Sequence, residues 1–163
     1  MSLTSFPPAT GKNPVGWVRV FIAAKSDVKT IPPATSGDVS SAITMETGKV
    51  FIDFPFDDEA GSFCSMEQPE AEGTTGYKYN FTMFYAANTA AAKAALDALD
   101  GVYCIIIGQR SDGSKEILGD TDRGIRLYIA REEAKGSRAG YPLTGSVIMD
   151  HLLYTYSNGT IPT

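Results

Sequence analysis

The stretch GYKYNFTMFYAANTAAAKAALDALDGVYCIIIG, residues 76–108, constrains the fold most, because its hydrophobic rhythm changes twice. From Tyr77 to Tyr85 every second residue is aromatic or Met, which predicts a strand with one apolar face. Residues 89–100 are rich in Ala and Leu and predict a helix, with Asn88 as N-cap and Gly101 as the C′ residue. The apolar run after Gly101 predicts a strand that is buried on both faces.

The predicted helix carries one apolar stripe, formed by Ala92, Ala95, Leu96 and Leu99. This spacing of i, i+3, i+4 and i+7 places the four side chains on one side of the helix. About three turns of helix are marginal in isolation, so we expect this helix to pack against a sheet.

The rest of the chain predicts short strands separated by turns, in keeping with its 16 Gly and 9 Pro among 163 residues. The strands are expected at residues 16–24, 42–44, 49–54, 116–119, 125–130, 141–149 and 152–156, with Val50, Ile52 and Phe54 on one face of the third of these. The predicted fold class is mainly β: an antiparallel β-sandwich or small barrel with one α-helix packed on it. It would form a single domain over residues 16–156, after an extended N-terminal arm (1–15) and before a C-terminal tail (157–163).

Residues 55–76, PFDDEAGSFCSMEQPEAEGTTG, form the longest segment without a hydrophobic period and are predicted to be a long loop. Its aromatic and sulfur residues, among them Phe56, Phe63 and Met66, argue against a plain disordered linker. Asp53, Asp57, Asp58 and Glu59 cluster at its start. They lack the ligand spacing of a calcium loop, so a solvated acidic loop is the favoured interpretation.

Composition excludes several classes of protein. A net charge of -5 argues against a dedicated nucleic-acid binder, which needs a basic face. Cys64 and Cys104 with one histidine do not make a zinc site, so we expect reduced thiols. We expect neither a membrane span nor a signal peptide, and we interpret the sequons at Asn80 and Asn158 as chance matches.

No constellation specifies a reaction, and the chain is predicted not to be an enzyme and to need no cofactor. The GQRSDGSK segment, residues 108–115, lacks the Gly-Lys-Ser/Thr order of a phosphate loop and predicts a hairpin instead. Asp120 and Asp122 are interpreted as turn residues. His151 has no candidate nucleophile beside it. An aromatic set, Tyr77, Tyr79, Tyr85 and Tyr103, is interpreted as core or interface, with a ligand pocket as the alternative.

A series of segments between Tyr77 and Met149 resembles the tail tube (major tail) protein of tailed bacteriophages, of the type found in phages of Bacteroidetes-like hosts. They are the strand, the helix ending in ALDALDG, the apolar strand, the SDGS hairpin, LGDTDRGIRL and GYPLTGSVIMD. The resemblance covers somewhat under half of the chain. Pro142 departs from the pattern, because it cannot donate to a strand ladder, and it predicts a strand start or an edge.

The resemblance implies a structural virion protein, assembled in the cytoplasm of the bacterial host, whose hexameric rings stack head to tail as a conduit for DNA ejection. Its partners would be copies of itself, other tail proteins and DNA that passes without specific binding, with no membrane. The strands at 77–86 and 102–108 would belong to the tube wall. The arm and the 55–76 loop, with Phe56, Phe63 and Met66, would contact neighbouring subunits. The candidates for an acidic lumen or rim are Asp53, Asp57, Asp58, Glu59 and Asp120.

Two alternatives remain open from the residues alone. One is a monomeric, lipocalin-like ligand-binding or carbohydrate-binding module that uses the tyrosine face. The other is a head–tail joining or capsid decoration protein.

Overall fold

The computed structural model describes residues 16–54, 63–67, 76–85, 89–131 and 140–163. The elements within these ranges are β1 (Arg19–Ala24), η1 (Lys25–Asp27), β2 (Val28–Thr30), β3 (Asp38–Val39), β4 (Thr44–Met45), β5 (Ile52–Phe54), β6 (Phe63–Glu67), β7 (Tyr77–Tyr85), α1 (Ala90–Leu99), β8 (Tyr103–Gln109), β9 (Lys115–Leu118), β10 (Ile125–Ile129), β11 (Tyr141–Met149) and β12 (Tyr154–Tyr156).

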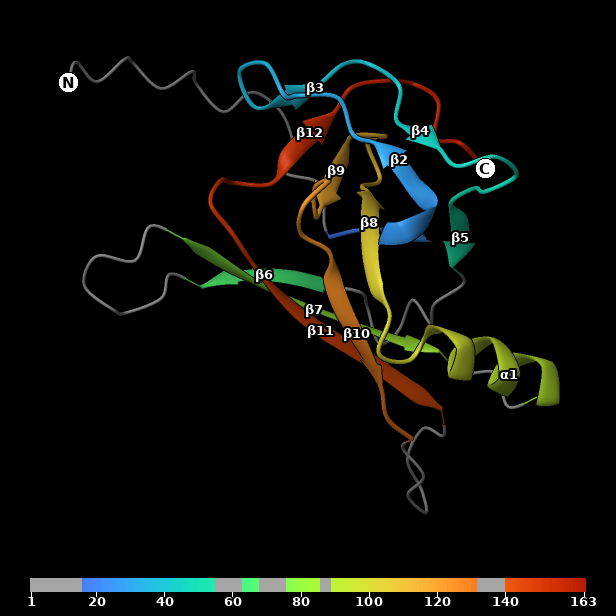
Figure 1. Cartoon of the computed structure of the whole chain (residues 1–163). Helices are drawn as coiled ribbons and strands as arrows, with labels where there is room; N and C mark the ends of the chain where they lie inside the picture. Colours follow the sequence, from blue (N-terminus) through green and yellow to red (C-terminus); the bar gives the residue numbers. More distant parts are fainter. Residues whose placement is uncertain (1–15, 55–62, 68–75, 86–88, 132–139) are drawn as a thin grey trace.

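Ten of the strands form one bent sheet, which we describe as two halves (Figure 1). Sheet A has the order β5-β1-β8-β9-β12-β3, and sheet B has the order β10-β11-β7-β6. They join where Tyr103 and Cys104 of β8 pair with Arg126 and Ile125 of β10. Neighbouring strands are antiparallel except for β12 and β3. The predicted mainly-β, sandwich-like fold with one helix is therefore confirmed.

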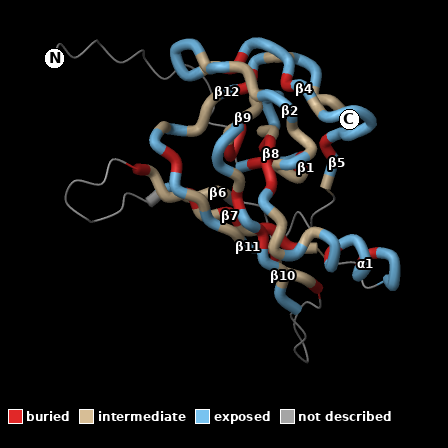
Figure 2. The backbone as a smooth tube through the Cα atoms, viewed as in Figure 1, coloured by how far each residue is buried: buried red, intermediate tan, exposed pale blue. Residues whose placement is uncertain are grey.

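Two hydrophobic cores lie on the two faces of sheet A, and Figure 2 shows buried stretches in the strands of both sheet A and sheet B. In β1, Val20 and Ile22 contribute to the core shared with sheet B, whereas Phe21 and Ala23 contribute to the second core. The second core is covered by the segment around Val39, Ile43 and Phe51 and by Tyr156. Alternate residues of one strand serve both cores because successive side chains point to opposite faces.

The apolar run of β8 is buried on both faces, as the sequence predicts, from Cys104 to Gly108. Gly108 is required by close packing, because a Cβ at this position would overlap the indole ring of Trp17. The indole Nε1 donates a hydrogen bond to Glu116 Oε2 at 3.1 Å across the β8–β9 hairpin. That hairpin, in place of a phosphate loop, is confirmed by the Arg110 N to Ser114 O hydrogen bond of 2.8 Å.

The helix α1 lies at the periphery, as Figure 1 shows, with Ala92 and Leu96 buried against the core. Thr89 is its N-cap and accepts a hydrogen bond from Ala92 N at 3.2 Å, so the prediction of Asn88 was wrong by one residue. Thr89 Oγ1 provides the acceptor that an orphan first-turn amide needs. Gly101 follows the helix with φ of 72°, which confirms the predicted C′ glycine.

The structure corrects one other prediction and adds detail to two more. The predicted 55–76 loop contains the strand β6, which pairs along five residues with β7. Val50, Ile52 and Phe54 do share a surface, but Val50 and Ile52 are 48% and 64% exposed, and the buried residue is Phe51. The predicted tail after residue 156 packs on the domain, because Pro162 O accepts a hydrogen bond from Phe51 N at 2.7 Å.

Candidate assembly surface

Sheet B has one buried face and one open face. On β7 the buried face carries Tyr79, Phe81 and Met83, and the residues between them point to the open face. Hydroxyl, amide, Tyr and basic side chains dominate that open face: Lys78, Asn80, Thr82, Arg126, Tyr128, Thr144, Ser146 and Ile148. Antiparallel pairing places these residues in rows across the strands, and the side chains described on this face include no carboxylate.

The two edges of sheet B differ. The β10 edge is covered by the segment after α1, because Leu127 N donates to Val102 O at 3.2 Å and Gly101 N donates to Leu127 O at 2.8 Å. Ile129 N on the same edge donates to Asp100 Oδ1 at 2.9 Å. The β6 edge pairs with β7 on one side only, within the part of the chain that the structure describes.

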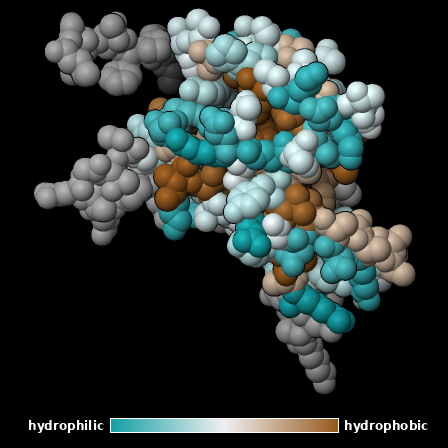
Figure 3. Space-filling view, in the orientation of Figure 1, coloured by the Kyte–Doolittle hydropathy of each residue, from teal (hydrophilic) through white to brown (hydrophobic). Residues whose placement is uncertain are grey.

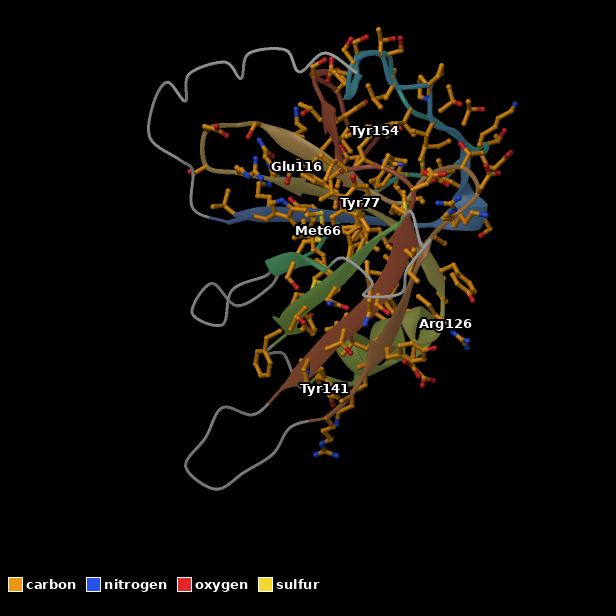
Figure 4. All side chains as sticks on the ribbon, turned by 90° about the vertical axis from the view of Figure 1, so that its left-hand side faces the viewer. Met66, Tyr77, Glu116, Arg126, Tyr141 and Tyr154 are labelled. Atoms are coloured by element: carbon orange, nitrogen blue, oxygen red, sulfur yellow. The ribbon has the colours of Figure 1, made fainter. Side chains whose placement is uncertain are left out.

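The backbone groups on the β6 edge can be identified by residue. Ala130 N donates to Pro142 O at 3.0 Å, so the even-numbered residues of β11 direct their backbone groups toward β10. In an antiparallel sheet, successive residues of a strand direct their backbone N–H and C=O groups toward opposite neighbouring strands. The odd-numbered residues of β11 therefore bond to odd-numbered residues of β7, and the even-numbered residues of β7 bond to Phe63, Ser65 and Glu67 of β6. Cys64 and Met66 therefore direct their N–H and C=O groups outward, as a template for a further strand. Figure 4 shows Met66 on this strand, where its side chain is 49% exposed.

A basic and aromatic group lies where β8 and β10 meet. The Arg126 guanidinium is 5.8 Å from the ring centre of Tyr103 and 5.3 Å from that of Tyr128. Its Nε donates to Gly101 O at 3.0 Å, and Figure 4 shows the side chain projecting outward from the sheet. Beside it lies a shallow hollow of about 740 Å³, whose lining includes Lys25, Tyr103, Arg123 and Ile148. We call this the basic hollow.

An apolar groove of about 340 Å³ lies between α1 and the strands β1 and β5. Its lining includes Ile52, Phe54, Tyr85 and Leu99, with Asp27 as its charged residue. Figure 3 shows the alanine-rich surface of α1, which is pale brown and largely apolar, at the margin of the molecule. Such a groove suits an apolar side chain or a small apolar ligand.

The single histidine belongs to a turn cluster that joins two connections. His151 stacks on Tyr154 with 3.9 Å between ring centres, and its Nε2 is 3.7 Å from Asp120 Oδ2 and 3.8 Å from Asp150 Oδ1. Asp120 Oδ1 also accepts hydrogen bonds from the turn amides of Asp122 and Arg123, at 2.8 and 2.6 Å. The predicted turn role of Asp120 is therefore confirmed.

The two predicted acidic candidates that the structure describes lie on different elements. Asp53 lies on β5 and pairs with Arg19, whereas Asp120 lies in the turn before β10. Neither belongs to the open face of sheet B. Phe56, Asp57, Asp58 and Glu59 lie outside the described residues, as does the side chain of Phe63.

The predicted tyrosine face does not form one pocket. Tyr79 is buried, and its hydroxyl accepts a hydrogen bond from Leu153 N at 3.0 Å. Burial raises the pKa of Tyr79. Tyr77 and Tyr85 pack at the rim of the same core, whereas Tyr103 lies on the opposite, exposed side beside Arg126.

Both cysteines are free thiols, and burial raises the pKa of each to about 12, with the Glu116 carboxylate adding to the effect at Cys64. Among the described residues, no three His, Cys, Asp or Glu side chains are grouped as metal ligands would be. No helix in the described ranges is long and apolar enough to span a membrane.

Sequence reasoning missed the Arg126 group. The period-two pattern of IRLYIA could have placed Arg126 and Tyr128 on one exposed face, because they are two residues apart on a strand. Nothing in the sequence places Tyr103 beside them, since that contact depends on the pairing of β8 with β10.

No family model matches the chain, and no curated protein and no solved structure is significantly similar to it.

Proposed function

We propose that the chain is a structural subunit that associates with copies of itself into rings, and that these rings stack as the tail tube of a tailed bacteriophage. The observation that supports this most is the asymmetry of sheet B, whose β10 edge is covered and whose β6 edge is uncovered among the described residues. An uncovered strand edge invites pairing with another chain. If the β6 edge contacts a different surface of the next copy, the contact is heterologous and generates a ring or a filament, whereas pairing of β6 with β6 would give a closed dimer.

The open face of sheet B suits the wall of a DNA conduit. Hydroxyl and amide side chains such as Asn80 and Thr144 hold water, and the described cations of this face, Lys78 and Arg126, are few for a surface that binds DNA. The segments that resemble the tail tube protein, residues 77–149, supply α1 and every strand of sheet B except β6. The negative net charge of the chain is also compatible with passage of DNA without adhesion.

A matched pair of substitutions at Met66 tests the role of the edge. Met66→Pro removes an outward N–H without removing a hydrogen bond to β7, so the subunit should stay folded and lose edge pairing. Met66→Ala keeps the N–H and is the control. Light scattering over a concentration series and negative-stain electron microscopy should show rings or tubes for the wild type and for Met66→Ala, and single subunits for Met66→Pro.

The same measurement separates the alternatives. Wild-type chains that remain monomeric at high concentration, with no rings in the micrographs, would contradict the proposal. They would favour the binding module, for which the apolar groove beside α1 would be the candidate site. Single rings that never stack would favour a head–tail joining protein.

A further inference from the structure

Arg126 carries a charge that no described carboxylate neutralises. Its Nε donates a hydrogen bond to Gly101 O at 3.0 Å, and the guanidinium makes cation–π contacts with the rings of Tyr103 and Tyr128. The Nη groups at the outer end of the guanidinium remain able to donate to a carboxylate, which matches the fork geometry of Arg. An arginine that is oriented in this way loses little side-chain freedom when it binds an anion.

The adjacent basic hollow adds a second cation and an apolar rim. Lys25 lines it and makes no ion pair among the described residues, whereas Arg123 is paired with Asp150 at 3.0 Å. Asp122 is the acidic residue in the lining. Exposed Tyr103 and Ile148 supply apolar surface beside these charges. The hollow therefore fits a segment that combines carboxylates with an aromatic side chain.

The chain itself contains a segment of this chemistry. From Val50 to Gly76 there are seven acidic residues and no Lys or Arg. Residues 55–62, PFDDEAGS, combine Phe56 with the consecutive acids Asp57, Asp58 and Glu59. The charge complementarity to Lys25 and Arg126 is direct.

A second copy is better placed to supply this segment than the same chain. Tyr103 at the basic hollow lies two strands across and five residues along from Phe54, which is roughly 19 Å at about 4.8 Å per strand and 3.3 Å per residue. Phe56 is two residues after Phe54, and a fully stretched chain of that length spans about 7 Å. The chain between Phe54 and Phe56 is therefore too short to place Phe56 against Tyr103 of the same copy.

We propose that the basic hollow, together with Arg126, binds the acidic segment 55–62 of a second copy of this chain, with Phe56 against Tyr103 and the carboxylates on Arg126 and Lys25. This inference rests on the self-association proposed above and names where one of its contacts lies. It also provides a use for an acidic segment that would otherwise add to the repulsion between negatively charged subunits.

The test uses a fluorescein-labelled peptide of residues 52–62, IDFPFDDEAGS, and fluorescence polarisation. The full chain is kept at concentrations at which light scattering reports single subunits. The peptide should bind, and ten times more salt should weaken the binding. A control peptide with Asp57→Asn, Asp58→Asn and Glu59→Gln should bind at least about tenfold more weakly.

Substitutions in the protein locate the site. Arg126→Gln should weaken peptide binding about tenfold. Arg126→Lys keeps the charge and loses the planar guanidinium, so its affinity for the peptide should lie between those of the wild type and Arg126→Gln. Lys25→Gln should weaken binding about threefold. The matched control is Lys29→Gln, the same change of charge on the neighbouring β2, and it should stay within about twofold of the wild type. The single Trp, Trp17, reports by its fluorescence whether each variant is folded.

The outcomes separate this inference from the proposed function. Peptide binding that depends on Arg126 supports the inference even if no rings form. Rings without peptide binding by single subunits would overturn the inference and leave the tail tube proposal intact. An equal loss of peptide binding for Lys29→Gln and Arg126→Gln would also overturn the inference. So would the finding that a labelled DNA duplex binds in an Arg126-dependent way and the peptide does not bind.

Discussion

At the scale of single residues, Gly108 is the position where the structure leaves least freedom. It lies in the centre of sheet A beneath the ring of Trp17, with no space for a Cβ. Glycine in a strand interior often marks such a close approach, here of an aromatic ring. The indole also bridges to Glu116, so the contact joins the start of the domain to the β8–β9 hairpin.

Gly108→Ala should therefore lower the free energy of unfolding by about 3 kcal/mol, because the indole must move out of its site. The control is Gly113→Ala in the hairpin turn, where φ is 86° and the space is open. That change should cost only about 1 kcal/mol, from the left-handed backbone. Urea unfolding followed by Trp17 fluorescence measures both, and equal costs would contradict the packing role of Gly108.

The raised pKa values of Cys64 and Cys104 predict how stability depends on pH. Each thiol has a pKa of about 12 in the folded chain against 9.0 for an ordinary thiol, so the folded state holds the proton more tightly. The resulting stabilisation is complete below pH 9 and is lost as the pH rises from 9 toward about 12. The free energy of unfolding should fall by up to about 1.4 kcal/mol per pH unit for each thiol.

Urea unfolding at pH 8, 9.5 and 10.5 measures this slope. Cys104→Ala should show a shallower fall than the wild type, because one of the two thiols is gone. The same burial should make both thiols react slowly with a disulfide reagent at pH 8 in the folded chain and rapidly in guanidinium. Fast labelling of Cys104 in the folded chain would contradict the prediction.

At the scale of elements, α1 depends on its ends and on few core contacts. Thr89 caps its first turn, and only Ala92 and Leu96 are buried. Thr89→Ala should destabilise the chain by about 1 kcal/mol, and Thr89→Ser, which keeps the acceptor, by much less. Chemical unfolding measures both, and equal losses would show that the hydroxyl does not act as the cap.

The strand β6 shows where prediction of an element fails. Its five residues lie between segments rich in Gly, Pro and acids, and FCSME is too short to display a clear alternation. It is a strand because β7 offers it a long partner edge, with Ser65 opposite Asn80. By contrast, β7 and α1 were predicted correctly because nine and ten consecutive residues each repeat one periodicity.

At the scale of the whole molecule, the two cores should unfold together. They share β1 and β8, whose alternate residues enter one core or the other. Loss of either core therefore removes one side of the same strands, and partial unfolding is unfavourable. Trp17 reports on the first core, and far-ultraviolet circular dichroism reports on all strands.

These two signals should change at the same urea concentration, within error, in one cooperative transition. Ile105→Ala, which removes a buried group from the second core, should lower the free energy of unfolding by about 3 kcal/mol, whichever of the two signals is used to measure it. Separate midpoints for fluorescence and circular dichroism would show that the two cores are independent.

The sequence by itself determined the elements whose signal is local. Alternation in β7, the Ala-rich helix, the uninterrupted apolar run of β8 and the turns at Asp112 and Asp120 all depend on residues that are near one another in the chain. Only the tertiary structure decided the edge strand β6, the placement of Asp53 and Asp120 on different elements and the contact of Arg126 with Tyr103. These depend on which strands pair, and strand pairing joins residues that are far apart in sequence, where no local periodicity carries information.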